Sequence, residues 1–276
     1  MLRKLMKHEF RATGRMMLPM FLVVLVTAVG ANLSTRRLLE TDNGALNTLG
    51  MLLLIAFTLA IMGVCIMPLV LMIQRFYKNL LRDEGYVMLT LPVSVHQHVW
   101  SKLLVSMAWF AATAAVVFLA FVILVYEVGL AQQFFTGLGD LLRQVRLGDY
   151  ALELGPAVGI GVEVLVLLVL SCAAGCLQIY AAMAIGHSFA RRKTLWSVAI
   201  FFGSQFALQL LGGLLTTLVS ATGLDHTLTQ MLPRVEDSPV RATMLLTFIL
   251  ILFGALFAAL FYFLTTYFLK KRVNLE

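Results

Sequence analysis

Six long apolar runs constrain this chain more than any other feature of its sequence. They cover about residues 16–34, 49–73, 103–126, 156–184, 195–220 and 242–269. Each is near or above the roughly 20 apolar residues needed to cross a bilayer as a helix. An α-helix satisfies every backbone polar group within its own segment, as the water-free interior of a bilayer requires. The sequence therefore predicts an all-α, polytopic integral membrane protein with six transmembrane helices, forming a single transmembrane domain over residues 1–276.

The composition leaves no room for a separate soluble domain. Hydrophobic residues make up 61% of the chain and charged residues 13%, whereas soluble domains carry about 25% charged residues. The longest polar interval, about residues 128–154, is too short to bury a core of its own. A net charge of +7 in a soluble protein would indicate nucleic-acid binding. Here the charges are distributed relative to the membrane, and we expect no nucleic-acid partner.

The basic residues predict the orientation of the six spans. Fifteen of the 21 lie in the N-terminal segment, the loops near 75–102 and 186–194, and the C-terminal segment, which an even number of spans places on one side. Segments rich in Lys and Arg stay in the cytoplasm. We therefore expect both termini to be cytoplasmic.

Residues 1–15 form an amphipathic pattern. Leu2, Leu5, Met6 and Phe10 recur at helical spacing, and basic side chains cover most of the remaining surface. A basic amphipathic helix of this kind lies in the headgroup plane of a membrane with its cations toward anionic lipid. The sequence predicts an N-terminal interfacial helix that contacts membrane lipids.

The segment between the second and third runs, residues 75–94, combines charges with an apolar tip, and we call it the elbow. Residues 74–81 are expected to continue the second span as a helix, and Gly85 suits a helix C-terminus. Pro92 and then Ser94, a good N-cap, precede the third span. Exposed apolar surface at the end of a membrane helix needs a partner to bury it. An interfacial hairpin that dips into lipid is the alternative, but the charges of residues 82–84 favour a protein groove.

The residues of the elbow also carry a family resemblance. The runs Arg75–Leu81, Asp83–Tyr86 and Thr90–Ser94 resemble the permease subunits of bacterial ATP-binding-cassette (ABC) transporters of the type-2, exporter, group. The resemblance implies that residues 1–15 are a connecting helix and that the elbow is the coupling helix that contacts an ATPase subunit. The contact residues that it implies are Arg75, Tyr77, Lys78, Arg82, Asp83, Glu84, Gly85, Tyr86, Met88, Leu89 and Pro92. It further implies a dimer with a second copy or a related permease, and a location in the bacterial cytoplasmic membrane.

The chain has no ATP-binding motif of its own. No Gly-x-x-x-x-Gly-Lys-Ser/Thr loop and no Gly-Lys pair occurs in it, and such a loop cradles the phosphates of ATP. We therefore expect no cofactor on this chain, with ATP and Mg held by a partner ATPase. The substrate class that we expect is a hydrophobic or amphipathic peptide, lipid or drug.

Three polar residues within the runs are candidates for a substrate pathway. Glu163 lies in the fourth run beside several glycines, and an ionisable side chain there usually faces a bundle interior or a wet cavity. It either lines the route or is structural, paired with an outer arginine such as Arg143 or Arg146 or reaching the interface. Gln205 and Gln209, one turn apart in the fifth run, either face a pathway or bridge to a neighbouring helix by hydrogen bonds.

Other functions remain as alternatives. An ATPase-independent channel or secondary transporter usually carries several ionisable groups near the membrane midplane, and this chain offers Glu163 alone. A membrane scaffold would bind a partner at the elbow without stimulating ATP hydrolysis. An intramembrane enzyme would need catalytic groups within the spans, where no such set is evident. His96 and His98 resemble a metal-binding pair but lack an obvious third ligand, so no metal site is predicted.

Overall fold

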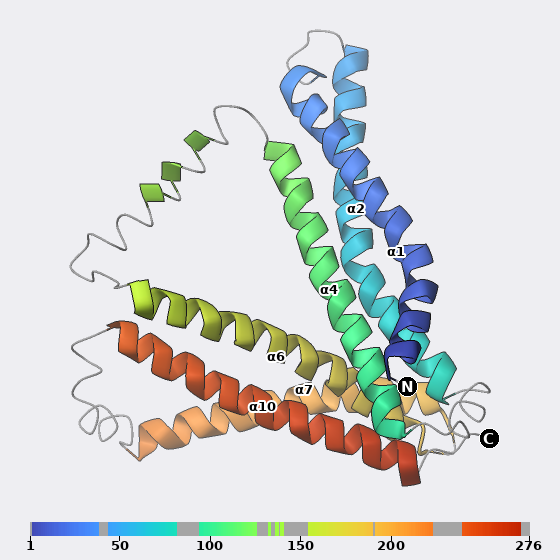
Figure 1. Ribbon diagram of the computed structural model, residues 1–276, viewed down its shortest axis with the longest axis vertical. Helices are drawn as coiled ribbons and strands as arrows, with labels where there is room; N and C mark the ends of the chain where they lie inside the picture. The colour runs from blue at the N-terminus through green and yellow to red at the C-terminus, as the bar shows by residue number, and fades with distance from the viewer. Residues whose placement is uncertain are drawn as a thin grey trace. The chain divides into compact units, whose positions relative to one another are not determined.

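The computed structural model describes residues 2–38, 44–81, 94–125, 132–133, 136–137, 139–140, 154–189, 191–222 and 239–271. The chain divides into two compact units. Unit 1 is Met1–Asn79 with Met88–Leu141, and unit 2 is Leu80–Val87 with Leu142–Glu276. Each unit contributes three long helices (Figure 1), and each is described by itself.

The described residues are almost entirely helical and include no strand. The long helices are α1 (Leu2–Leu33), α2 (Gly44–Phe76), α4 (Val95–Val125), α6 (Leu154–Gly186), α7 (Lys193–Ala221) and α10 (Pro239–Lys271). Among the described residues, these six helices are long and apolar enough to cross a membrane. The predicted all-α, multi-pass membrane protein is confirmed.

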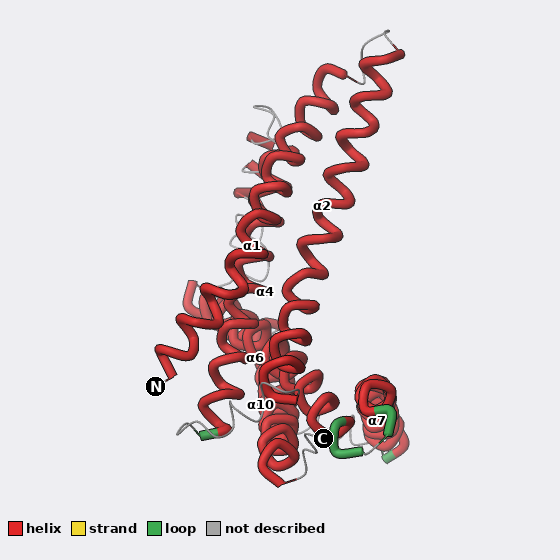
Figure 2. Tube along the Cα trace, turned by 90° about the vertical axis from the view of Figure 1, so that its right-hand side faces the viewer, coloured by secondary structure: helices red, strands yellow, loops and turns green. Residues whose placement is uncertain are grey.

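Unit 1 packs α1 against both α2 and α4. At one end Glu9 of α1 meets Arg75 of α2, and at the other Ser34 donates a hydrogen bond of 2.7 Å to the Gly50 carbonyl. These contacts run in opposite directions, so α1 and α2 are antiparallel (Figure 2). Between α1 and α4, Glu9 near the start of α1 contacts Lys102 near the start of α4. Further along both helices, the Asn32 amide donates to the Leu124 carbonyl at 2.8 Å. Helices α1 and α4 are therefore parallel.

A heptad-like seam on α1 forms the core of unit 1. The buried apolar residues of α1 alternate in steps of four and three along Met17, Phe21, Val24, Ala28 and Ala31. That spacing keeps one stripe of a helix facing its neighbours over many turns. The stripe packs on Phe57, Val64 and Leu71 of α2 and on Ala120 of α4.

Unit 2 has the same number of long helices but different contacts. Helices α6 and α10 are parallel, because Gly159, Glu163 and Leu170 lie against Met244, Thr247 and Gly254 in that order. Helices α6 and α7 are antiparallel, with Gln178 bonded to Ser204 and Gly186 beside Ser197.

The helices begin earlier than the apolar runs suggest. Residues 2–15, predicted as a separate interfacial helix, are the first turns of an unbroken α1, because only the isolated Gly14 weakens the helix before Met16. The predicted position of that segment in the headgroup plane stays a prediction. Helix α4 begins at Val95, directly after the predicted cap Ser94 and eight residues before the apolar run, so Lys102 lies within a helix and not in a loop. A hydropathy run ends at the first charge, whereas a helix continues as long as its backbone hydrogen bonds can form.

Candidate functional site

The elbow begins in a helix and is followed directly by a helix, as the sequence predicts. Helix α2 continues through a five-residue π-helical turn, η2 (Tyr77–Leu81). On the other side, Ser94 precedes α4, and its hydroxyl and carbonyl oxygens accept the Gln97 N–H at 3.4 Å and 2.9 Å. Local π turns within long helices often occur at functional sites.

Three of the predicted ATPase-contact residues are described. Arg75 is partly buried in the last turn of α2, Tyr77 is partly buried in η2, and Lys78 is exposed. The others lie outside the described residues: Arg82, Asp83, Glu84, Gly85, Tyr86, Met88, Leu89 and Pro92. Their role in binding an ATPase stays a prediction.

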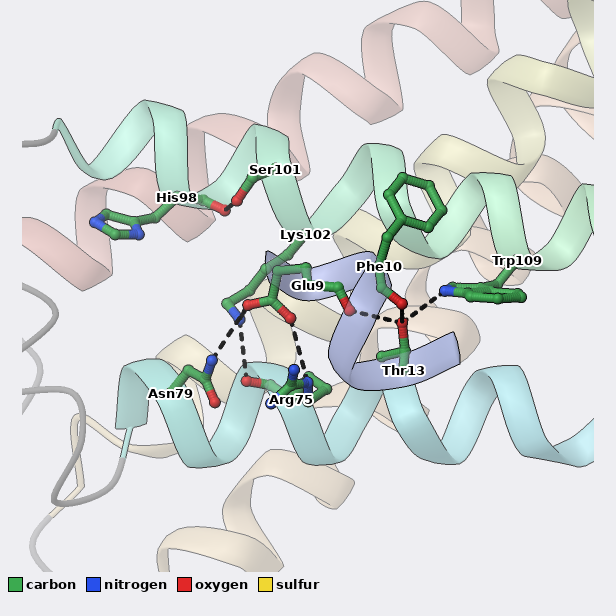
Figure 3. A network of polar contacts seen from close by, with 9 residues as sticks. All are labelled: Glu9, Phe10, Thr13, Arg75, Asn79, His98, Ser101, Lys102 and Trp109. Carbon is green, nitrogen blue, oxygen red and sulfur yellow. Dashed lines mark hydrogen bonds and ion pairs between the residues drawn. The ribbon is translucent and has the colours of Figure 1, made fainter. Parts of the chain in front are cut away.

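A charge cluster centred on Glu9 joins the three helices of unit 1 where the elbow begins and ends (Figure 3). The Glu9 Oε1 atom accepts hydrogen bonds from Lys102 Nζ of α4 at 2.8 Å and from Asn79 Nδ2 of η2 at 3.2 Å. Its Oε2 atom lies 3.2 Å from Arg75 Nε of α2. Lys102 also donates to the Arg75 carbonyl at 3.2 Å. One carboxylate thus binds residues of the helical segments that lead into and out of the elbow.

Burial makes this cluster more than a surface ion pair. The side chain of Lys102 is 5% exposed and that of Glu9 is 13% exposed. Removing one partner of a buried pair leaves an uncompensated charge in a poorly solvated place. Arg75 is 29% exposed, and its Nε faces Glu9 as an ion pair rather than as a well-aligned hydrogen bond. We therefore regard Lys102 as the stronger partner of Glu9.

A second contact lies one turn along α1 from Glu9. The Trp109 indole N–H of α4 donates to Thr13 Oγ1 at 2.7 Å, and Thr13 in turn donates to the Glu9 carbonyl at 2.8 Å. The same indole packs beside Phe10 and Phe21, with ring centroids 5.9 Å and 6.0 Å away. A Cβ at Gly14 would lie 3.6 Å from the Trp109 ring, which is an ordinary van der Waals contact. Helices α1 and α4 are thus joined at two separate heights.

Sequence reasoning did not single out Glu9 or Lys102. Glu9 is the one acidic residue among the first 39, a signal that an anion is needed in an otherwise basic segment. It also lies four residues before Thr13, on the side of α1 that leads into the buried seam. Only the tertiary packing of three helices reveals which cations it meets.

Glu163 of α6 has a neutral partner. Its Oε2 accepts a short hydrogen bond from Thr247 Oγ1 of α10, and Thr247 also donates to the Thr243 carbonyl at 3.0 Å. A Cβ at the neighbouring Gly159 would lie 2.9 Å from Met244 Cε, the flexible end of a side chain on α10. Arg143 and Arg146, the partners suggested by the sequence, lie outside the described residues. The pathway role of Glu163 stays a prediction.

The two glutamines of α7 differ from one another. Gln205 donates to Gln178 Oε1 of α6 at 3.3 Å, and Gln178 donates to Ser204 Oγ at 2.9 Å. Gln205 therefore bridges to a neighbouring helix. Gln209 is exposed on α7. A pathway role for either residue stays a prediction.

The turn between α6 and α7 brings two backbones together. A Cβ at Gly186 would lie 2.5 Å from the Ser197 backbone nitrogen, so only glycine fits there. The adjacent His187 is buried, with Nδ1 2.8 Å from the Met183 carbonyl. Burial lowers the pKa of His187, the Lys193 charge lowers it further, and the hydrogen bond to Met183 opposes both. A neutral imidazole suits this tightly packed turn.

The described residues bring no three His, Cys, Asp or Glu side chains together in a geometry suited to a metal ion. In comparisons with known proteins, no family model, no curated protein and no solved structure matches the chain.

Proposed function

We propose that this chain is the permease subunit of an ATP-driven exporter of the bacterial ABC type-2 group. In this proposal it works in the cytoplasmic membrane with both termini in the cytoplasm. It pairs with a second copy or a related permease, and separate ATPase subunits hold ATP and Mg. The substrate is a hydrophobic or amphipathic peptide, lipid or drug.

The observation that carries the proposal is how the elbow is mounted. Helix α2 runs on to Arg75 and through η2, helix α4 begins directly after Ser94, and Glu9 binds residues on both sides. A segment that receives force from a partner must be connected to the membrane helices by rigid structure rather than by a flexible loop. The elbow has such a mounting, and its sequence is the part that resembles the exporter permeases.

The proposed mechanism follows from that mounting. ATP binding closes the ATPase subunits, and their movement displaces the elbow. Because α2 and α4 extend directly from it, the displacement tilts or shifts these helices rather than bending a loop. The shift opens a route between two permease copies toward the outside, along which the substrate leaves the membrane or the cytoplasm.

The proposal is tested by gentle purification of the chain from its native host in nanodiscs, followed by mass spectrometry and an ATPase assay. We expect a stoichiometric ABC ATPase with vanadate-sensitive hydrolysis. Recovery of the chain alone under several mild conditions would contradict the proposal and favour a self-sufficient channel or carrier. A bound partner without stimulated hydrolysis would favour a scaffold.

Variants in the elbow make the test specific. Charge reversal at Asp83 and Glu84, or Leu89→Asp, is expected to abolish ATPase co-purification while the chain still inserts. The matched control is Arg191→Glu, a charge reversal at an exposed residue in the turn between α6 and α7, which is expected to retain the ATPase. Normal co-purification of the elbow variants would remove the coupling role.

A further inference from the structure

Resting on the proposed function, we propose that Glu9 is a positioning residue of the coupling apparatus. It fixes α1 to the two helix ends that carry the elbow, so that α1, α2 and α4 move together when the ATPases act. The N-terminal helix then takes part in force transmission and is more than a membrane-surface anchor.

The two carboxylate oxygens of Glu9 have different partners, and this supports the inference. Oε1 binds Lys102 of α4 and Asn79 of η2, whereas Oε2 faces Arg75 of α2. The bond from Lys102 to the Arg75 carbonyl links α4 directly to α2. The three helices are thus joined pairwise, and none can slide along another without separating charges that are largely shielded from water.

The hydrogen bond between Trp109 and Thr13 prevents α1 and α4 from rotating against one another, as well as from sliding. Thr13 and Trp109 join α1 to α4 one helical turn beyond Glu9. A single contact lets two helices pivot about it, whereas two contacts at different heights fix their relative angle. Helices α1 and α4 therefore behave as one rigid body at this end of unit 1.

The position of the cluster along the chain links it to the elbow. Arg75 lies two residues before the start of the turn Tyr77–Leu81, and Lys102 lies about two turns into α4. A displacement of the elbow reaches Asn79 and Arg75 through η2 and the last turn of α2, and it reaches Lys102 through the first two turns of α4. Glu9 is the residue of α1 to which Arg75 and Lys102 transmit that displacement.

A purely structural role for Glu9 predicts a different outcome, so the experiment needs a readout of coupling. We would use the complete permease–ATPase complex in nanodiscs, with Cys65, Cys172 and Cys176 replaced by Ala. Spin labels are placed at two exposed positions, Ala12→Cys on α1 and Leu119→Cys on α4. Dipolar EPR distances are measured without nucleotide and after ADP–vanadate trapping, beside ATP hydrolysis per bound ATPase.

With Glu9 present, we expect the distance between the labels to stay constant on trapping. Glu9→Gln is expected to keep its ATPase but to lose vanadate-sensitive hydrolysis by about fivefold or more, the lower end of ordinary coupling between sites. Its label distance should shift or broaden on trapping. The control Arg11→Gln, which removes an exposed charge from the same helix, should behave as the parent.

Two results would overturn the inference while leaving the proposed function intact. One is a Glu9→Gln complex with parental hydrolysis and a constant distance. The other is a change above about 2 Å in the parent itself, the size of ordinary helix shifts, and this measurement holds even if Glu9→Gln fails to insert. Absence of any ATPase from the parent complex would instead remove the proposed function, and this inference with it.

Discussion

Glu9 and Glu163, the two carboxylates within the six described long helices, meet opposite surroundings. Glu9 in unit 1 faces two cations and an amide donor from two other segments. Glu163 in unit 2 has one described partner, the hydroxyl of Thr247. Unit 1 thus uses its carboxylate to fix three helices together, whereas in unit 2 the backbones of α6 and α7 approach closely at Gly186. The comparison shows two ways of joining membrane helices, one by charge and one by close backbone approach.

Reversing the charge at Glu9 is expected to have the largest effect. Glu9→Lys places a third cation beside Lys102 and Arg75 and should destabilise unit 1 by about 3–5 kcal/mol. Hydrogen exchange measured by mass spectrometry in nanodiscs should show lost protection in α1, α2 and α4, with α6, α7 and α10 unchanged. The double variant Glu9→Lys with Lys102→Glu should restore part of the lost protection. Equal losses of protection in both units would contradict the role of Glu9 as a contact that holds unit 1 alone.

Adding a methyl group at Gly186 tests the other way of joining helices. Gly186→Ala forces α6 and α7 apart at Ser197 and should cost about 3 kcal/mol, at the upper end for overpacking. The loss of protection should be confined to unit 2. Gly203→Ala on α7 is the matched control, because nothing lies within 4 Å of a Cβ there. If Gly186→Ala matches the control, close backbone approach does not hold this helix pair.

Removing the indole donor of Trp109 gives a smaller effect in unit 1. Trp109→Phe keeps the aromatic contacts with Phe10 and Phe21 but loses the bond to Thr13, which is worth about 1 kcal/mol. Faster exchange is expected in α1 and α4 near these residues. The control is Trp196→Phe, which alters an exposed tryptophan in unit 2. No change in α1 would show that the bond from Trp109 to Thr13 does not help to hold this helix.

The smallest effect is expected from Glu163→Gln. The amide oxygen of glutamine can still accept the Thr247 hydrogen bond, so stability should change by less than about 0.5 kcal/mol. Glu9→Gln, the same chemical change in unit 1, should be far more costly because two cations lose their anion. Transport by the Glu163 variant is a separate readout, and unchanged transport would leave only a structural role for Glu163.

The sequence was sufficient for the features that local chemistry determines. Hydropathy located all six helices, and the helical continuation to Leu81 and the cap at Ser94 followed from residue preferences. The sequence did not predict contacts between residues that lie far apart along the chain. Lys102 was grouped with the loop charges because the apolar run begins at residue 103, and the sequence did not single out Gly186. Their roles depend on Glu9 and Ser197, which only the packing of helices brings near.

The bonds at the far end of unit 1 have a consequence for its evolution. Asn32 and Ser34 donate to the backbone carbonyls of Leu124 and Gly50, acceptors that every residue type provides. Mutation of Leu124 therefore leaves the bond from Asn32 available, and no compensating change is selected. Glu9 and Lys102 lack that freedom, because loss of either charge strands the other. Among descendants of this chain, the charged end of unit 1 should change in pairs, whereas the opposite end can drift one residue at a time.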